Sequence, residues 1–570
     1  MPLIPFGEWR PDNSDINGAN SKTLTNVLPR GDGYGPAPSL LAYTSAMPAA
    51  CRGFFYGRLT DGTVQVFAAT VDRLYMLNNT TQTWTPCSKH ATVTSITNAS
   101  PGVVNYTAHG YLAGDPVVFG GTVLPAEIVA GTVYYVHATG LTANAFSVSA
   151  TSGGARINTS GGSGTPTVTA IYSSLASTAQ TRFVQFNNLV IACHVGIAPQ
   201  VFTLGSSSAF VDLAGSPPNA AYVSVVNRFV VLTGLATSSA YRVQWSGLNS
   251  VNAAGSYTPG TAQSDYQDLS DGGLTRGVAG SDTSCVIFQD TAIRLMTYAP
   301  GSPYIFSIQR IASDDGLIAP YSLVSVSDRI FFLSPTGFKM LAGTQITPIG
   351  KERVDRTFFA DWDSSAPQLM MGAADPRGTR VSWAYKSVNG STGFSDKLIT
   401  YDYMLDRWTT ANVTTEFLAS LARPGVTLEG VDAAYGSNID TLTLDSLDSI
   451  SNAAYSAFSG VDSAHRLGFF SGPNLEATLQ TPEQGGDGTR FYVRGFRPIS
   501  DAATVYGAVS YRELQSATPT LGSETLVNAV GSCPQRRSTR FARANVRIPA
   551  ATTWTYISGI EPDFSPEGTR

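Results

Sequence analysis

The chain has 570 residues, more than a single hydrophobic core usually serves, so the sequence predicts two or three domains. Only 14% of the residues are charged, well below the roughly 25% typical of soluble proteins, whereas glycine, serine and threonine are frequent. This composition is typical of many short strands joined by tight turns. The formal net charge of −5 excludes a global basic field, so tight binding to DNA or to an anionic membrane surface by bulk electrostatics is not expected.

The first eight residues lack a basic segment followed by an apolar one, and no later run approaches about 18 apolar residues. We therefore expect a soluble protein made in the cytosol, without membrane insertion. The cysteines lie at long, irregular intervals with no Cys-x-x-Cys pair, which predicts reduced and mostly buried thiols. They are Cys51, Cys87, Cys193, Cys285 and Cys533.

Pairs of apolar runs separated by short polar turns recur along the chain and predict β-hairpins. Asparagine and aspartate tolerate the left-handed backbone conformation that such turns need, as in Asn187-Asn188 and Asn227-Arg228. The turns lie near residues 72, 187, 227, 290 and 328, with weaker examples near 377 and 437. Most gaps are about 40 to 60 residues, a spacing that suits the four-stranded blades of a β-propeller.

The interval from Asp72 to Asn187 is about 70 to 80 residues too long for this spacing. The excess coincides with a segment rich in threonine, glycine and valine, which has its own apolar runs at 117–119, 133–136 and 146–148 and a glycine-rich exit at 161–164. We expect a small β-domain inserted into the outer loop of the first blade.

The C-terminal part predicts a further β region, whose clearest strand is 541–548. There Ala542, Ala544, Val546 and Ile548 share one face, which is typical of a half-buried strand in a sandwich or platform. The predicted fold is all-β, with a β-propeller-like core, an inserted small β-domain and a C-terminal β-sandwich or platform. The predicted domains are an N-terminal arm (1–35), the first blade (36–90), the insert (91–172), the remaining blades (173–440) and the C-terminal platform (441–570).

Candidates for chemistry are few. No two histidines lie at metal-ligand spacing, and no phosphate-binding loop or nucleophile elbow occurs, so we expect no metal, no cofactor and no enzymatic activity. Asp361 with Asp363, and Asp314 with Asp315, are the best carboxylate clusters for a glycosidase, but the sequence favours carboxylates that cap turns at strand ends. Trp84, Trp245, Trp383 and Trp408 favour packing within blades over a sugar-binding surface.

The densest basic segment runs from residue 536 to residue 547. Arginine makes bidentate contacts with carboxylate and phosphate, so this segment is a candidate inter-subunit or DNA-facing strip. A solvated sheet face explains it equally well. The strip consists of Arg536, Arg537, Arg540, Arg543 and Arg547.

Several segments, in their order along the chain, resemble the packaged-DNA-stabilising tail-nozzle proteins of short-tailed phages, the family of tail tubular protein B. The resemblance covers most of residues 1–410 and recurs at 497–498 and 540–549, and it skips the insert. The segments are 3–12, 26–29, 33–40, 244–247, 265–269, 271–273, 316–322, 331–338 and 347–359. Within the insert, 108–115 and 131–136 resemble a small β-module that decorates assorted phage tail and fibre proteins.

The resemblance implies a structural virion protein of the tail, assembled in the host cytoplasm. It implies a homo-oligomer, a hexameric ring below the portal and its head-to-tail adaptor, which contacts tail fibres or a needle. Packaged double-stranded DNA would pass through the lumen without tight binding, during retention and ejection. The alternative is a tail protein for host attachment, as a receptor-binding or polysaccharide-degrading propeller.

Overall fold

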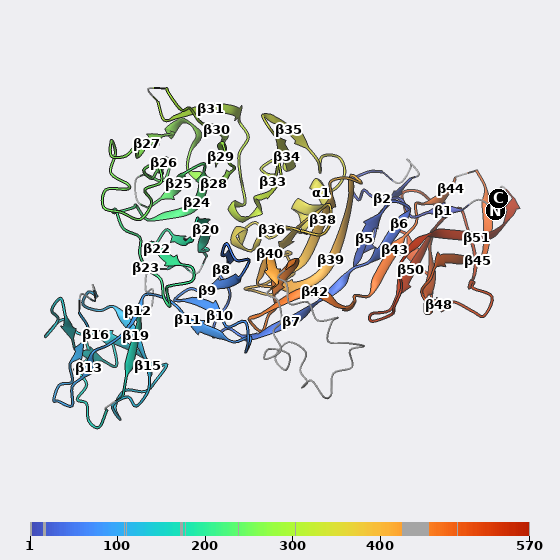
Figure 1. The fold of residues 1–570 in the computed structure, drawn as a ribbon. Helices are drawn as coiled ribbons and strands as arrows, with labels where there is room; N and C mark the ends of the chain where they lie inside the picture. The colour runs from blue at the N-terminus through green and yellow to red at the C-terminus, as the bar shows by residue number, and fades with distance from the viewer. Residues whose placement is uncertain are drawn as a thin grey trace. The chain divides into compact units, whose positions relative to one another are not determined.

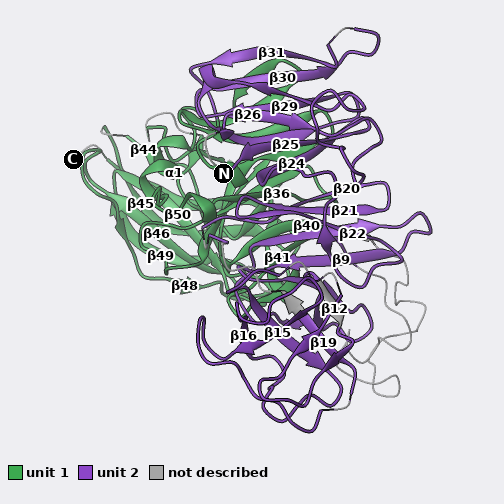
Figure 2. Cartoon of the chain, turned by 90° about the vertical axis from the view of Figure 1, so that its left-hand side faces the viewer, with its two compact units in different colours: residues 1–43, 317–421, 456–570 green, residues 44–316, 422–455 purple. Residues whose placement is uncertain are grey.

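The computed structural model describes residues 3–14, 19–107, 109, 111–162, 164–170, 175–176, 178–236, 239–302, 304–423, 455–486 and 488–568. The chain forms two compact units, which are coloured separately in Figure 2. Unit 1 comprises residues 1–43, 317–421 and 456–570, and unit 2 comprises residues 44–316 and 422–455. Among the described residues, no helix has the length and apolar character needed to cross a membrane.

Unit 2 contains four successive four-stranded antiparallel sheets, in each of which the strands follow chain order (Figure 1). Their strands are β8 (Gly53–Arg58), β9 (Val64–Ala69), β10 (Leu74–Leu77) and β11 (Trp84–Pro86); β20 (Arg182–Phe186), β21 (Leu189–His194), β22 (Ile197–Thr203) and β23 (Val211–Asp212); β24 (Ala220–Val226), β25 (Phe229–Leu235), β26 (Arg242–Trp245) and β27 (Asp265–Asp268); and β28 (Thr275–Gly280), β29 (Ser284–Gln289), β30 (Ala292–Tyr298) and β31 (Phe306–Ser313). A 3-10 turn, η3 (Ser270–Gly272), precedes β28.

Neighbouring sheets of unit 2 share hydrophobic clusters, and the first strands β8, β20, β24 and β28 contact one another in sequence. The predicted hairpins are confirmed: β20 pairs with β21 across Asn187, and β24 pairs with β25 across Asn227. Both asparagines have a positive φ, 54° and 53°, the left-handed conformation that these turns require. Such meanders, packed face to face, are the units from which β-propeller blades are built.

The insert forms two small sheets between β11 and β20. Their strands are β12 (His90–Thr92), β15 (Pro116–Gly121), β16 (Val133–Val136), β18 (Val148–Ser149) and β19 (Pro166–Ala170), and β13 (Ser95–Ile96), β14 (Val104–Asn105) and β17 (Ala145–Phe146). A separate hydrophobic cluster, which includes Val117, Phe119 and Phe146, lies between them. The predicted residues Ala108, Gly110 and Ser163 lie outside the described part.

Unit 1 contains two further four-stranded sheets and a short helix. The elements are β32 (Val324–Val326), β33 (Arg329–Ser334), β34 (Gly337–Ala342) and β35 (Gln345–Pro348); β40 (Phe417–Arg423), β41 (Tyr455–Val461), β42 (Arg466–Asn474) and β7 (Pro38–Ala46); α1 (Asp355–Asp361); and the 3-10 turns η4 (Pro320–Ser322) and η5 (Pro367–Leu369). The hairpin predicted near residue 328 is the pair β32–β33. The turn predicted near residue 437 lies outside the described residues.

Two larger sheets complete unit 1, with a short parallel pair, β2 (Glu8–Trp9) and β3 (Asn20–Ser21). The eleven-stranded sheet consists of β36 (Met371–Ala374), β37 (Arg380–Tyr385), β38 (Ser395–Asp402), β39 (Arg407–Thr415), β4 (Leu24–Thr25), β43 (Ala477–Gln480), β50 (Phe541–Ile548), β46 (Tyr506–Arg512), β47 (Thr520–Leu521), β44 (Gln484–Gly485) and β48 (Thr525–Leu526). The six-stranded sheet consists of β49 (Cys533–Thr539), β45 (Arg490–Ser500), β51 (Ile557–Gly568), β6 (Gly33–Pro36), β5 (Val27–Arg30) and β1 (Ile4–Pro5). One hydrophobic core joins both sheets.

The all-β prediction is confirmed, but the structure corrects the predicted domain boundaries. Residues 1–35 are not a separate arm, because β4, β5 and β6 are strands of the two larger sheets. The segment 36–90 is not a single blade, because β7 pairs with β42 and the first four-stranded sheet of unit 2 begins at β8. The expected separation between residues 440 and 441 lies outside the described part, and β4 links β39 to β43 in one sheet across it.

Candidate functional site: the basic strip and the neighbouring cavity

The structure divides the predicted basic strip between two sheets of unit 1. Arg536 and Arg537 lie on β49, which pairs with β45 in the six-stranded sheet. Arg543 and Arg547 lie on β50, between β43 and β46 in the eleven-stranded sheet. Arg540 lies in the short connection between the two strands. The five arginines therefore do not form one continuous face.

Arg543 is buried in an ion triad. Its Nε lies 3.5 Å from Oε1 of Glu483, and Arg512 binds the other oxygen of the same carboxylate. The side chains of Arg512, Glu483 and Arg543 are 7%, 5% and 8% exposed, so water screens their charges little. Arg543 therefore lies within the protein and does not present its guanidinium to DNA.

Arg547 also has its partners within the chain. It binds Glu524 with contacts of 2.8 to 3.1 Å and Glu476 at 3.0 Å, and it covers the ring of Tyr506 at 4.4 Å. The hydrogen bonds to Glu524 and Glu476 raise the pKa of Arg547, and the Arg547 bond lowers the pKa of Glu524. Two carboxylates thus neutralise this arginine.

A polar row crosses the same face of the eleven-stranded sheet between these two arginines. The amide of Gln480 on β43 donates to Asn545 on β50 at 2.9 Å, and Asn545 donates to Ser510 on β46 at 2.8 Å. The alternation predicted for 541–548 is confirmed, because Ala542, Ala544, Val546 and Ile548 are buried on the apolar side. The polar side is a cross-strand network that braces three strands.

The other three arginines of the strip are more exposed than Arg543. Arg536 and Arg537 are exposed and Arg540 is half-buried, and within the described residues none of them forms an ion pair. Arg537 covers the ring of Tyr511 at 4.3 Å, an arrangement that leaves the edge of its guanidinium open to solvent. These three arginines are the members of the strip that can meet an external partner.

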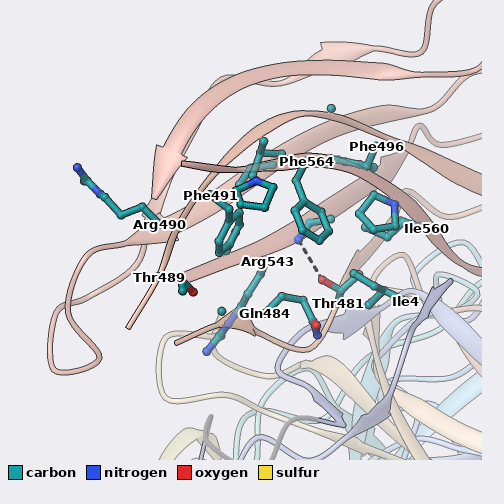
Figure 3. Close-up of a pocket in the computed structure, with 18 residues that line it drawn as sticks. Ile4, Thr481, Gln484, Thr489, Arg490, Phe491, Phe496, Arg543, Ile560 and Phe564 are labelled. Carbon is teal, nitrogen blue, oxygen red and sulfur yellow. Dashed lines mark hydrogen bonds between the residues drawn. The ribbon is translucent and has the colours of Figure 1, made fainter. Parts of the chain in front are cut away.

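A cavity of about 360 Å³ lies beside the strip, between β45 and β51 of one sheet and β50 of the other (Figure 3). It exists because Ala542 and Ala544 on the inward face of β50 are too small to fill the space. The next two inward residues of β50, Val546 and Ile548, are larger. Its opposite wall carries Phe491, Phe496, Val493, Ile560 and Phe564. Sequence reasoning missed this cavity, although the small residues on the apolar face of the predicted strand were the available signal.

The candidate carboxylates Asp361 and Asp363 are both held by neighbouring side chains. Asp361 accepts hydrogen bonds from Lys397 at 2.8 Å and from the hydroxyl of Tyr385 at 2.9 Å. Asp363 accepts from Lys386 at 2.7 Å and from Ser365, and these bonds lower its pKa to about 2. A general acid needs a raised pKa, so this arrangement favours turn carboxylates.

The second carboxylate cluster also lies in a turn. Asp314 has a positive φ of 62°, and the backbone N–H of Asp315 donates to Thr291 at 3.2 Å. Both residues lie between the end of β31 and η4. This placement is typical of a turn, which is the interpretation that the sequence favours.

The histidines and cysteines are dispersed in the structure. Buried His109 accepts the backbone N–H of Tyr111, burial lowers the pKa of His194 to about 4, and His465 contacts Glu416 at 2.6 Å. Among the described residues, no group of three or more metal-ligating side chains occurs. All five cysteines are buried thiols outside any disulfide, as predicted. Trp245, Trp383 and Trp408 are buried in cores, as expected for packing, whereas Trp84 is half-buried.

Two motifs of the resemblance, 3–12 and 347–359, meet in unit 1. Arg353 binds Glu8 at 3.3 Å and Asp406 at 2.6 Å. The carboxylate of Asp12 accepts the backbone N–H groups of Arg356 and Thr357 in the first turn of α1. Charged residues from segments far apart in the sequence therefore bind one another within one folded unit.

No protein-family model matches the sequence, and no curated protein matches it. Solved structures align with the chain at low identity. The WD40 domain of Neurospora crassa Pan2 shares 7% identity at a TM-score of 0.28, over 66% of this chain and 88% of that one. Hsv2 of Kluyvelomyces marxianus shares 7% at 0.26, over 64% and 97%, and the computationally designed Ika8 protein shares 10% at 0.24, over 61% and 97%. The fold class rests on the four-stranded sheets themselves.

Proposed function

We propose that this chain is a structural subunit of the tail nozzle of a short-tailed phage, which lines the DNA exit channel below the portal and its adaptor. The observation that carries the proposal is the ordered series of nozzle-like motifs from Leu3 to Phe359. Their charged residues bind one another, as with Arg353 and Glu8 or Asp12 and α1. These contacts support a fold shared with the nozzle proteins, because segments that resembled the family only by chance would not be expected to bind one another.

The charge distribution supports a channel wall that does not hold DNA. The chain has a net charge of −5, and Arg543 and Arg547 bind carboxylates within the protein. A polyanion binds tightly where several unpaired cations meet phosphates. Of the strip, only Arg536, Arg537 and Arg540 form no ion pair within the described residues, which is a small array. DNA can therefore pass during ejection, and closure of the channel retains the DNA before ejection.

Native mass spectrometry of the purified protein, alone and with the head-to-tail adaptor, tests this proposal. We expect a closed ring of six copies that binds the adaptor. Imaging of virions that carry a labelled copy of this protein locates it in the particle. We expect the label in the tail, just below the portal. A monomer that ignores the adaptor, or a label on the capsid or on distal fibres, contradicts the proposal.

The insert favours a second role, recognition of a host receptor. It has its own hydrophobic cluster, and its two ends pair with each other, with His90 opposite Thr169 and Thr92 opposite Thr167. Deletion of residues 91–171 with a short glycine-serine linker should therefore leave the sheets of unit 2 intact. If the insert is the recognition head, the deleted phage assembles but does not adsorb, whereas normal adsorption reduces the insert to decoration.

A further inference from the structure

The cavity between the two larger sheets of unit 1 has the properties of a binding site. Its volume of about 360 Å³ falls in the range of roughly 300 to 1,000 Å³ that ligand pockets occupy. It is more than twice the size of a cavity of about 150 Å³ that takes up benzene. Space of this size inside an otherwise close-packed sandwich is unusual, because protein interiors leave few voids larger than a water molecule.

The cavity is built into the backbone and does not depend on one rotamer. One wall is the pair Ala542 and Ala544, which cannot extend to fill it. The other wall includes Pro562 and Pro566 on β51, whose rings fix the backbone, and Phe491 and Phe564, which pack edge to face at 5.7 Å. The site is therefore formed before any ligand arrives, which lowers the entropic cost of binding.

The cavity opens to solvent at one end. Phe564 is 41% exposed there, and Gly485 and Thr489 are also exposed. Within the described part of the chain, the amide of Gln484 makes one hydrogen-bond contact, 3.5 Å to Pro482, so its oxygen can accept and its nitrogen can donate. Farther inside, the hydroxyl of Thr481 already accepts the backbone N–H of Ala544 at 3.0 Å. The polar groups available to a ligand thus lie at the mouth.

The two arginines that line the cavity do not offer it a charge. Arg490 points away in Figure 3 and binds Glu513 at 2.7 Å. Arg543 has its side chain on the opposite face of β50 from Ala542 and Ala544, where it binds Glu483. Among the described lining residues an ionised ligand group would find no available counter-ion, which is costly in an apolar site.

We propose that this cavity binds a neutral amphiphile, with its apolar body between Phe491, Phe564 and the two alanines. Its hydrogen-bonding end lies at Gln484 and Thr489. This role is independent of the nozzle assignment, since it follows from the walls and the mouth of the cavity.

Fluorescence titration of the full-length protein with aminoanthracene, a neutral aromatic amine, tests the proposal. We expect saturable binding that decanol displaces, with decanol binding at least about tenfold more tightly than decanoate because the site lacks a counter-ion. Filling the cavity by Ala544→Leu should weaken aminoanthracene binding by about tenfold or more. Ala542→Leu serves as a second filling variant if the first does not fold, as judged by its thermal transition.

The matched control is the double variant Leu521→Ser with Leu526→Ser, which removes exposed apolar side chains elsewhere on unit 1. Its affinity for aminoanthracene should equal that of the wild type. Absence of saturable binding overturns the proposal, as does binding that survives both folded filling variants or is lost in the control. Decanoate binding as tight as decanol binding overturns the assignment of a neutral ligand.

Discussion

The carboxylate of Asp12 accepts the backbone N–H of Thr357 at 2.9 Å, across 345 residues of sequence. It also accepts the N–H of Arg356 at 2.8 Å, so a residue near the N-terminus caps helix α1. Helix α1 has no cap from its own preceding residue, Val354. The first turn of this helix is thus completed by a remote segment, which ties the two segments of unit 1 together.

Removal of this cap should destabilise unit 1. Because two N–H groups lose their acceptor, Asp12→Ala should lower the free energy of unfolding by about 1 to 2 kcal/mol. Asp12→Asn should cost less, since asparagine also caps helices well. Urea denaturation followed by tryptophan fluorescence measures both. Asp32→Ala, at an exposed turn position, is the control, and an equal loss in the control would contradict the capping role.

Asp355 should give unit 1 a distinctive pH dependence. Burial raises its pKa from the ordinary value of 3.8 to about 6, with a further contribution from the nearby charge of Asp12. Between these pH values the folded state binds more protons than the unfolded state, so stability falls as the pH rises from about 4 to about 6. The full effect is about 2 to 3 kcal/mol.

The variant Asp355→Asn isolates this contribution. It keeps an oxygen that can accept the N–H of Phe338 at the position of the present 3.1 Å bond, but it does not titrate. We expect the free energy of unfolding of the variant not to fall between pH 4 and pH 6 as that of the wild type does. If the two free energies show the same dependence on pH, the carboxyl of Asp355 does not cause the decline.

The ion triad predicts a large loss of stability when the acid that its two arginines share is neutralised. Glu483→Gln removes the buried carboxylate that binds Arg512 and Arg543, which should cost about 3 to 5 kcal/mol. Glu561→Gln removes the partner of Arg497 in an exposed pair and should change stability by less than about 1 kcal/mol. Chemical denaturation of both variants tests the contrast. Similar small losses would mean that the triad is not effectively buried in solution.

The arginines that form no ion pair with any described residue, Arg536 and Arg540, test the role of the strip. Arg536→Glu with Arg540→Glu should leave the free energy of unfolding within about 0.5 kcal/mol of the wild type. If these residues form a subunit contact, the double variant assembles poorly by native mass spectrometry. Full assembly with faulty DNA retention in phage would instead favour a role in the lumen. Arg543→Ala with Arg547→Ala should weaken assembly only if it also lowers the free energy of unfolding, because both arginines bind carboxylates within the chain.

The cysteines provide a measure of local opening. Burial raises the pKa of Cys533 to about 11 and that of Cys285 to about 12. All five thiols should therefore resist a disulfide reagent in the native protein and react fully in urea, as a spectrophotometric thiol assay shows. Rapid reaction of one thiol in the native state would identify a site that opens locally.

Local features of the fold could be predicted from the sequence. The Asn187 and Asn227 turns, and the alternation of Ala544 and Arg543, follow from backbone geometry and from the two-residue period of a strand. The pairing of Thr25 with Thr410 could not be predicted in this way, because it joins segments that carry no local signal of each other. The same holds for the site. The arginines of the strip could be found in the sequence, but their partners Glu483, Glu476 and Glu524 could not, because the pairing of separate strands brings them together.

The pairing of β1 and β6 with β51 places the first and last strands of unit 1 in one sheet. While the chain is being synthesised, β1 lacks its sheet partner and β6 pairs only with β5 until β51 leaves the ribosome. Domains whose strands are contiguous can fold during translation, but the six-stranded sheet cannot form fully before β51 has been made. A prematurely terminated chain therefore keeps unpaired strand edges, which mark it for proteolysis before it can enter an assembly.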